Sequence, residues 1–475
     1  MRGNTLVAVL VVSFAACGAD ESPDAADLVI SNATVVDVES GDLVPGRTVF
    51  VEGGRIVGIV AAARASVPEG AREVDATGRY LIPGLWDAHV HSAAGTSWHF
   101  PLLVAHGVTS VRNLHTTVDT ALDLTNAVRR RVASGELLGP RFLANGPIID
   151  GYPASWPGSI EARTPAEGRA AVDSLAEGGA DFIKVYDNLT PEVYDAIMAA
   201  AGERGIPVDG HVPFLVTAEH AAASGQRTVE HMTGMNLACS TRADSLRDEY
   251  RGLRERLPSM SFPDNAVAFF TLVRAASDNR DVALCAGTVQ AYLDARVTVV
   301  PTLVIGNVDA EELVADSARM RLLPADVRGA WTGMAAGGPG PIDAVFLGGE
   351  WTAAHDTRMV HEAGVPILAG TDIGNPFLIP GLSLHEELGL LVTEGGLSPL
   401  EALRAATINP AGTFGLADSL GKVAEGRIAD LVLLGANPLE DIGNVSAIDA
   451  VVLNGRYLDR AALDGLLAEA AASAD

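Results

Sequence analysis

The segment Tyr80-Leu-Ile-Pro-Gly-Leu-Trp-Asp-Ala-His-Val-His91 decides how the whole chain is interpreted. Its apolar residues predict a short strand over residues 80–87, with His89 and His91 following where the strand ends. Side chains alternate between the two faces of a strand, so histidines two positions apart point to the same side. Because imidazole is a common metal ligand, the pair indicates a metal site at the end of a buried strand.

Four more ligand-type side chains follow apolar runs further along the chain, namely Lys184, His211, His231 and Asp372. The C-terminal ends of parallel strands converge at one mouth of a barrel, where barrel enzymes carry out their chemistry. A His-x-His pair alone would be weak evidence. All six residues together predict a two-metal hydrolytic site.

The middle of the chain alternates strand and helix signals, which favours parallel β/α units. Hydroxyl caps followed by proline predict helix starts at Thr164, Thr190 and Ser398, two of them with a capping-box glutamate. The expected strands cover residues 80–87, 108–113, 141–144, 182–186, 207–210, 228–230, 297–304 and 366–370. We therefore predict an α/β fold with a (β/α)8 TIM barrel over residues 83–407.

Both ends of the chain show short alternating runs that are typical of β structure. In residues 27–82, Gly53-Gly54 separates two such runs as a hairpin turn does. Residues 408–475 contain similar runs and are expected to end in a helix. We predict that the two ends build one smaller β-sandwich domain, with the barrel inserted between them. Within the barrel, residues 239–295 form a looser helical stretch, which we interpret as an insertion above the barrel and a lid.

The composition indicates a globular protein. The chain has 475 residues, of which 48% are hydrophobic and 20% charged, so a large domain plus a smaller one is expected. Its formal charge of −27 argues against nucleic acid as a partner, since phosphate binding requires a basic surface.

The N-terminus predicts export. Arg2 precedes an apolar run over residues 6–16 that is too short to span a bilayer, which is typical of a signal peptide. Small residues directly before Cys17 indicate a lipoprotein, lipidated at Cys17, with residues 17–26 as a tether; ordinary signal cleavage is the alternative. The predicted location is the bacterial cell envelope, lipid-anchored or periplasmic. There, Cys239 and Cys285 could form a disulfide or remain two buried thiols, and the sequence leaves both open.

Lys184 lies inside the apolar run Phe182-Ile-Lys-Val-Tyr186, where an ammonium ion is costly to bury. Facing two divalent cations, the ammonium would also be repelled. Reaction with carbon dioxide would convert the side chain into a carbamate, whose two oxygens can bridge a metal pair. The alternative is a structural, ion-paired lysine.

These motifs resemble the amidohydrolase superfamily, in its binuclear branch. The chain is similar to the imidazolonepropionase-related amidases and to the Xaa-Pro and Xaa-Lys/Arg dipeptidases. Besides residues 80–91, the resemblance rests on three motifs: Gly107-Val-Thr-Ser-Val-Arg-Asn113, Leu400-Glu-Ala-Leu-Arg-Ala-Ala-Thr-Ile-Asn-Pro-Ala411 and Gly421-Lys-Val-Ala-Glu-Gly-Arg-Ile-Ala-Asp-Leu-Val432.

The resemblance implies a role for each candidate ligand. His89, His91 and Asp372 would hold one metal, His211 and His231 the other, and carboxylated Lys184 would bridge two divalent ions. Zinc is the expected metal. A hydroxide between the ions would attack the amide carbonyl of a dipeptide or N-acyl amino acid, with Asp372 as general base and then acid.

Two residues are weaker candidates for substrate contacts. Tyr186 lies two positions beyond Lys184 and should point to the same side, where it could steady an oxyanion or grip substrate. His115 follows the second strand and could line the pocket. Arg112 is expected to pair structurally within the barrel.

Other functions remain alternatives. A mononuclear deaminase, or a hydrolase of cyclic amides, lactones or organophosphates, would use the same scaffold, but such deaminases generally lack the bridging lysine. A non-catalytic envelope binding protein is disfavoured because the full ligand set is present. An oligomer is compatible with the sequence. The loops over residues 235–295 and 306–350 carry no pattern that identifies a substrate.

Overall fold

The computed structural model describes residues 22–92, 97–116, 121–338, 340 and 353–473. The predicted signal peptide and Cys17 lie outside these ranges, so the lipidation prediction is not tested. Within the described ranges, no helix combines the length and hydropathy that a bilayer-spanning segment requires.

Eight parallel segments close into a barrel in the middle of the chain, which confirms the predicted fold class. They are β6 (Leu85–Val90), β7 (Val108–Asn113), β8 (Arg141–Ala144), β11 (Ile183–Val185), β12 (Val208–Gly210), β13 (Thr228–Glu230), β14 (Thr298–Val300) and the irregular segment 366–370. Backbone hydrogen bonds of 2.7 to 3.0 Å join neighbours that share no regular ladder: Asp181 N to Ala144 O, Arg227 N to Val208 O, Val299 N to Pro366 O and Ala88 N to Ala369 O. The last of these closes the ring between its first and eighth segments.

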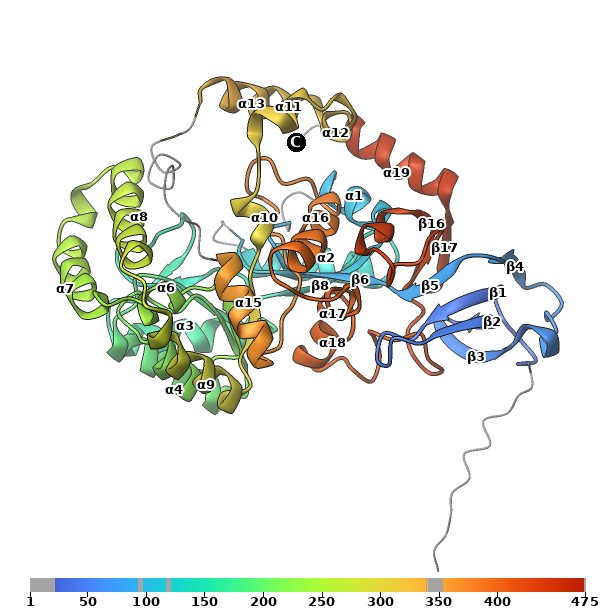
Figure 1. Cartoon of the computed structure of the whole chain (residues 1–475), viewed down its shortest axis with the longest axis horizontal. Helices are drawn as coiled ribbons and strands as arrows, with labels where there is room; N and C mark the ends of the chain where they lie inside the picture. The colour runs from blue at the N-terminus through green and yellow to red at the C-terminus, as the bar shows by residue number, and fades with distance from the viewer. Residues whose placement is uncertain (1–21, 93–96, 117–120, 339, 341–352, 474–475) are drawn as a thin grey trace, which may run out of the picture.

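Helices follow most of the strands, and many of them cover the barrel (Figure 1). They are α1 (His99–Ala105), α2 (Ala121–Ala133), α3 (Pro165–Glu177), α4 (Pro191–Arg204), α5 (Ala218–Ala223), α6 (Met235–Ala238), α7 (Ala243–Arg254), α8 (Phe262–Asp278), α9 (Cys285–Ala295), α10 (Leu303–Gly306), α11 (Ala310–Ala315), α12 (Ser317–Met320), α13 (Ala325–Ala336), α15 (Ala353–Ala363), α16 (Leu382–Thr393), α17 (Pro399–Ala405), α18 (Ile408–Thr413) and α19 (Arg460–Ala472). The caps predicted at Thr164, Thr190 and Ser398 are confirmed, each accepting a backbone N–H of the first turn.

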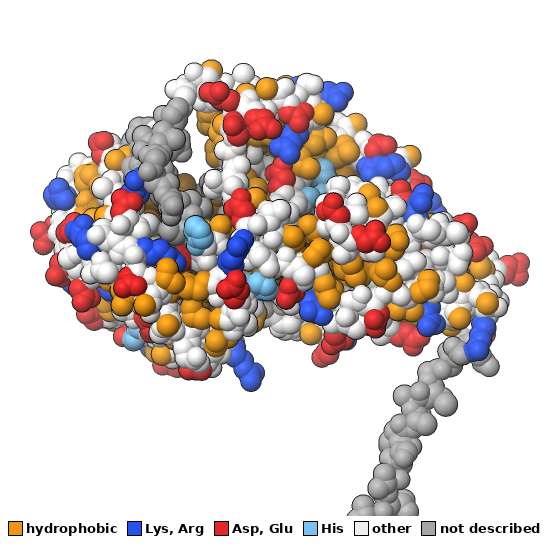
Figure 2. All heavy atoms as spheres, viewed as in Figure 1, with side chains coloured by type: hydrophobic (Ala, Val, Ile, Leu, Met, Phe, Trp, Pro, Cys, Tyr) orange, Lys and Arg blue, Asp and Glu red, His pale blue; other side chains and the backbone are white. Residues whose placement is uncertain are grey.

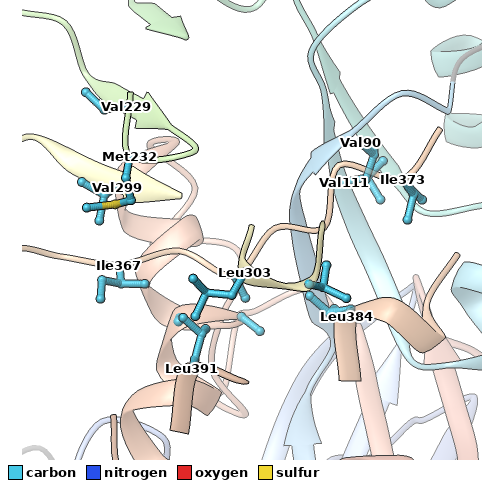
Figure 3. Packing of buried hydrophobic residues seen from close by; sticks show 14 of the residues in the cluster. Val90, Val111, Val229, Met232, Val299, Leu303, Ile367, Ile373, Leu384 and Leu391 are labelled. Atoms are coloured by element: carbon cyan, nitrogen blue, oxygen red, sulfur yellow. The ribbon is translucent and has the colours of Figure 1, made fainter. Parts of the chain in front are cut away.

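One hydrophobic core fills the layer between the barrel strands and these helices. Val229, Val299 and Ile367 come from consecutive barrel segments and belong to the same buried cluster as Leu303 and Leu391 (Figure 3). Charged residues lie next to core residues of these strands: Glu230 follows Val229, and Lys184 lies between Ile183 and Val185. Neighbouring residues of a strand point to opposite faces, so the barrel strands bury apolar side chains on the face toward the helices and polar side chains on the other face.

The two ends of the chain build one β unit, as predicted. Its strands form a continuous sheet in the order β17-β16-β15-β5-β1-β2-β3, with β4 paired to β1. The strands are β1 (Leu28–Val36), β2 (Leu43–Glu52), β3 (Arg55–Ala61), β4 (Arg72–Asp75), β5 (Tyr80–Pro83), β15 (Leu431–Leu434), β16 (Ile448–Leu453) and β17 (Arg456–Asp459). We call it the terminal sheet; Figure 1 shows β1–β4 at the opposite end of the molecule from α7 and α8.

Strand β15 connects the core of the terminal sheet to that of the barrel. Leu431 and Leu433 pack with apolar residues of β1–β3, whereas Val432 and Leu434 belong to the barrel cluster. This alternation has the two-residue period of a strand. One layer of strands thus contributes to two cores.

The strand predicted over residues 80–87 is two strands in two sheets. Strand β5 pairs with β1 and β15 of the terminal sheet, and β6 pairs with β7 of the barrel. The break falls at Gly84, where an added Cβ would lie 2.1 Å from Thr109 Oγ1. Only glycine lets the chain pass that close to β7 as it changes sheets.

The predicted strand over residues 297–304 is too long. Strand β14 ends at Val300, and Thr302 takes a left-handed conformation (φ 51°) before α10 begins at Leu303. This turn gives Thr302 a role at the site described below.

The insertion predicted over residues 239–295 consists of helices with a small core of their own. Phe214, Leu246 and Tyr250 form this core with Phe269 of α8. A disulfide joins Cys239, after α6, to Cys285 at the start of α9, which is one of the two states that the sequence left open.

Candidate active site

Three of the six predicted ligands are in direct contact. Asp372 Oδ1 lies 2.7 Å from His91 Nε2 and 3.2 Å from His89 Nε2. Asp372 adopts a left-handed conformation (φ 62°), and its N–H donates to His89 O over 2.7 Å. The two histidines do point to the same side, as their spacing predicts. Ligand atoms of all three residues lie within 4.8 Å of one another, which suits a metal ion.

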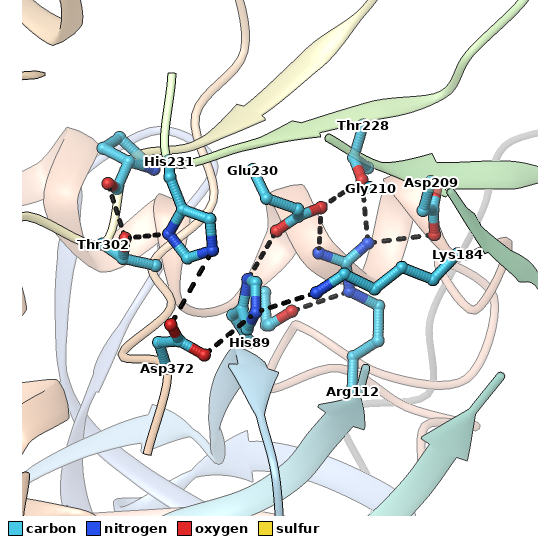
Figure 4. A network of polar contacts seen from close by, with 12 residues as sticks. His89, Arg112, Lys184, Asp209, Gly210, Thr228, Glu230, His231, Thr302 and Asp372 are labelled. Atoms are coloured by element: carbon cyan, nitrogen blue, oxygen red, sulfur yellow. Dashed lines mark hydrogen bonds and ion pairs between the residues drawn. The ribbon is translucent and has the colours of Figure 1, made fainter. Parts of the chain in front are cut away.

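The other three predicted ligands surround this group. The His231 ring lies 4.6 Å from the His89 ring and 5.0 Å from the His211 ring, centroid to centroid. Lys184 Nζ lies 3.5 Å from His89 Nε2, and Figure 4 shows its side chain pointing toward His89. The structure therefore brings together all six residues, which lie in or directly after strands β6, β11, β12 and β13 and the eighth segment.

Three of the histidines are oriented through their Nδ1 atoms. His89 Nδ1 lies 2.8 Å from Glu230 Oε2, His211 Nδ1 lies 2.8 Å from Asp187 Oδ1, and His231 Nδ1 lies 2.6 Å from Thr302 Oγ1. Thr302 Oγ1 donates its own hydrogen to Pro301 O, so it accepts from His231. Carboxylate or hydroxyl partners of this kind fix the Nδ1–H tautomer of metal-binding histidines.

These contacts leave the Nε2 atoms as acceptors. His89 Nε2 then faces Asp372 Oδ1, so two lone-pair atoms approach each other with no proton between them. His211 Nε2 is buried and has no hydrogen-bond partner among the described residues. Both features fit a cation in the middle of the cluster, because a metal binds deprotonated imidazole and carboxylate. The donor set therefore fits a divalent metal.

Burial sets the charge of these groups. It lowers the pKa of His211 and of His231 well below the ordinary value, so both are neutral at neutral pH. It also lowers the pKa of Lys184 to about 8. Burial alone would raise the pKa of Asp372, but His89 and His91 outweigh it and hold that pKa well below its usual range.

Arg112 organises the carboxylates beneath the ligands. Its guanidinium is fully buried and donates to Asp209 Oδ2 (2.9 Å), Glu230 Oε1 (2.8 Å) and Thr228 Oγ1 (2.9 Å). Burial alone would raise the pKa of Glu230, but Arg112 and His89 outweigh it and lower that pKa. Glu230 therefore stays ionised and links Arg112 to His89 (Figure 4).

A cavity of about 280 Å³ opens onto the cluster and is lined by His211, His231 and Asp372. Tyr186 also lines it, with its ring stacked on His211 at 3.9 Å, and its hydroxyl accepts from Trp156 Nε1 over 2.7 Å. This position suits the contact predicted for Tyr186.

His115 lies behind the ligands rather than in the cavity lining. Its ring is 6.4 Å from that of His91, and its Nε2 lies 3.2 Å from Pro157 O. Burial lowers the pKa of His115 to about 4, so the ring is neutral.

Comparisons with known proteins agree with this geometry. A model of the amidohydrolase family matches residues 80–458. The chain is 25% identical over 441 residues to adenine deaminase of Moorella thermoacetica, covering 91% of this chain and 57% of that enzyme. It is 42% identical over 89 residues to adenine deaminase 3 of Rhizobium meliloti, covering 18% of this chain and 15% of that enzyme. The chain thus spans less than two thirds of these relatives.

Solved structures match over nearly their whole length. A Bifidobacterium longum protein assigned as a prolidase has a TM-score of 0.65 and 26% identity, covering 94% of this chain and all of that one. A bottromycin amidohydrolase has a TM-score of 0.67 and 26% identity, covering 94% and 91%. A Xaa-Pro dipeptidase with bound methionine, at 20% identity and a TM-score of 0.63, covers 91% and 99% and shares the fold. On the family match over residues 80–458, the chain belongs to the amidohydrolase family.

Proposed function

We propose that the protein is a binuclear metal-dependent hydrolase that cleaves the amide bond of a dipeptide or N-acyl amino acid. One observation carries the proposal: four histidines, Asp372 and a buried lysine converge at one mouth of the barrel. The solved structures named for prolidase and dipeptidase activity support peptide-like substrates.

His89, His91 and Asp372 would hold one ion, and His211 and His231 the other. Two divalent ions, zinc by the preference of these ligands, would supply a water of lowered pKa and polarise the scissile carbonyl. Lys184, with its pKa lowered to about 8, is partly neutral at neutral pH and can react with carbon dioxide. Its Nζ forms a bond to the carbon and releases one proton, which gives a carbamate with two oxygen ligands.

Asp372 is the proposed general base and acid. Its carboxylate borders the cavity, so it can take a proton from the attacking water and deliver it to the leaving amine. Tyr186 can donate its hydroxyl hydrogen to the oxygen of the scissile carbonyl, because that hydroxyl accepts from Trp156. His115 does not line the cavity and has no role in the proposed reaction.

A mononuclear deaminase is the second candidate. The adenine deaminases among the relatives favour it, and His89, His91 and Asp372 alone could hold one ion. Metal analysis separates the two: about two ions per chain support the proposal, and about one supports the deaminase.

We further propose that the protein is exported to the bacterial cell envelope and anchored through Cys17. The disulfide between Cys239 and Cys285 supports an oxidising compartment. Mass spectrometry of the mature N-terminus tests the anchor.

Lys184→Ala is the decisive variant. We expect it to lose at least about 100-fold in kcat/KM, with partial recovery in added acetate, which replaces the carbamate oxygens. The chain has two lysines, so Lys422→Ala, at an exposed ion pair with Glu39, is the matched control. Labelled bicarbonate should give a ¹³C carbamate signal in the wild type and in the Lys422 variant. Full activity of the Lys184 variant without acetate would refute the binuclear proposal.

A further inference from the structure

Glu387 of α16 is an acidic side chain in an unusual place, because it is fully buried. Figure 2 shows many carboxylates at the surface of the face in view, whereas Glu387 is 0% exposed. Its Oε1 atom has no hydrogen-bond partner among the described residues. Burial raises the pKa of Glu387 to about 8, and the acids Asp87 and Glu394 act in the same direction. Burying a polar group in this way is costly, so the contacts that it does make need an explanation.

Those contacts are with the first turn of α10. Oε2 of Glu387 accepts a hydrogen bond from Val304 N over 2.8 Å. Against the raising effect of burial, the N–H groups of Val304 and Leu303 lower the pKa of Glu387. The first N–H groups of a helix have no partner within that helix, so Glu387 caps the start of α10.

Helix α10 is too short to hold its own position. It has four residues, Leu303–Gly306, which is little more than one turn. A single turn is unstable by itself, because forming it fixes several residues for one hydrogen bond. Helix α10 packs against α16, and Leu303 belongs to the same buried cluster as Leu384 and Leu391 of α16 (Figure 3). These apolar contacts hold α10 against α16, and the directional bond from Val304 to Glu387 fixes where α10 begins.

The residue just before α10 is strained. Thr302 has φ 51° and ψ 49°, a left-handed conformation that β-branched residues rarely adopt. Strain of this kind persists only where the surrounding structure enforces it. Thr302 is 2% exposed and directly precedes Leu303, so the fixed start of α10 is one of the constraints that enforce the turn.

The strained turn places a hydroxyl beside a predicted metal ligand. Thr302 Oγ1 lies 2.6 Å from His231 Nδ1 and donates its hydrogen to Pro301 O (Figure 4). Glycine would adopt this turn without strain, but it has no hydroxyl to accept from His231. A shift at the start of α10 would therefore move the group that orients His231.

We propose that Glu387 is a positioning residue for His231. By holding the start of α10, it keeps the turn at Thr302 in place, and the Thr302 hydroxyl keeps His231 in the Nδ1–H tautomer. His231 Nε2, 3.8 Å from Asp372 Oδ2, then faces the cluster as an acceptor. Glu387 does not line the cavity and acts through Val304 and Thr302. This inference deepens the proposed site of the second metal and rests on it.

Two substitutions of Glu387 separate its acceptor from its size. Glu387→Met keeps the length of the side chain and removes the acceptor, whereas Glu387→Gln keeps an acceptor. Chelator competition on the full chain loaded with zinc should show one ion bound about 10-fold more weakly in the Met variant and the other within about 2-fold. The Gln variant should stay within about 2-fold for both ions. Glu386→Met is the matched control, because this neighbouring glutamate of α16 pairs with Arg319.

A double-mutant cycle separates positioning from general packing. If Glu387 acts through Thr302, adding Glu387→Met to Thr302→Val weakens the affected ion by less than about 2-fold beyond Thr302→Val alone. Additive losses, or equal weakening of both ions, would mean that Glu387 only supports the fold and would overturn the inference. Should the Met variant not fold, Glu387→Asp, whose carboxyl group is one methylene closer to α16, tests the same bond with the same expected pattern.

The orientation of His231 can also be measured without metal. The metal-free protein is labelled with ¹⁵N-histidine, and the His231 signal is identified by its loss in His231→Asn. The wild type and the Gln variant should show the Nδ1–H tautomer, and the Met variant a mixture of both neutral tautomers. An unchanged His231 signal in the Met variant overturns the inference, whether or not two ions bind. If the wild type holds one ion only, the binuclear proposal fails, and this signal alone decides the role of Glu387.

Discussion

Both the barrel and the terminal sheet bury apolar side chains, but the barrel also buries charged ones. The barrel encloses Arg112, Lys184, Asp209 and Glu230, each at most 1% exposed, whereas the main core of the terminal sheet consists of aliphatic residues such as Leu431. Buried charges are expensive unless each is paired, and aliphatic burial is favourable without partners. Chemistry is thus concentrated in the part of the fold that is costly to assemble, and the terminal sheet adds stability without reactive groups.

The largest expected effect comes from removing a buried charge of the barrel. Arg112→Met should lower the free energy of unfolding by about 3–5 kcal/mol, because Asp209 and Glu230 lose a buried cation. Urea unfolding followed by circular dichroism measures the change. Arg131→Met, at an exposed pair with Glu136, should stay within about 0.5 kcal/mol. A loss below about 1 kcal/mol for the Arg112 variant would mean that the network is not structural.

Leu431→Ala tests the aliphatic core of the terminal sheet. Removing this fully buried side chain should cost about 3 kcal/mol through the cavity that it leaves. Metal content and kcat/KM of the folded protein should stay within about 2-fold, since Leu431 belongs to the core of the terminal sheet. Leu43→Ala, at a leucine of the same sheet that is 40% exposed, is the control. A matching loss of activity would show that the two regions are not separable.

The smallest expected effect comes from removing the hydrogen bond that orients His231. Thr302→Val keeps the β-branched shape but removes the acceptor for His231 Nδ1. We expect about 10-fold weaker metal binding, measured by competition with a chelator, and little change in unfolding. Thr332→Val, at an exposed helix position, should leave affinity unchanged. Unchanged affinity in the Thr302 variant would show that the tautomer of His231 is fixed by something else.

The sequence predicted the ligands better than their partners. His89 and Asp372 are recognisable because they combine a ligand side chain with the end of an apolar run. Glu230 carries no such signal: it reads as an ordinary strand residue before His231, and its contact with His89 spans 141 residues. Such pairings depend on which strands become neighbours, which local patterns do not contain.

Element boundaries failed where backbone geometry mattered more than hydropathy. The run over residues 80–87 is largely apolar because its two strands are buried in both sheets to which they belong. Hydropathy therefore does not mark the change of sheet, which occurs where Gly84 closely approaches Thr109. Helix α8 was similarly unreadable as a pocket wall. Its apolar residues serve two faces, one in the insertion core and one in the cavity, and a mixed pattern of this kind does not separate them.

The position of β5 has a consequence for how the protein is made. One edge of β5 pairs with β15, about 350 residues later in the chain. At roughly 5–20 residues per second, that partner leaves the ribosome roughly 20–70 s after β5 does. During this interval an apolar strand edge has no native neighbour, which is the state in which chains pair with one another. The short segment Tyr80–Pro83 is therefore one place where a newly made chain needs protection by a chaperone.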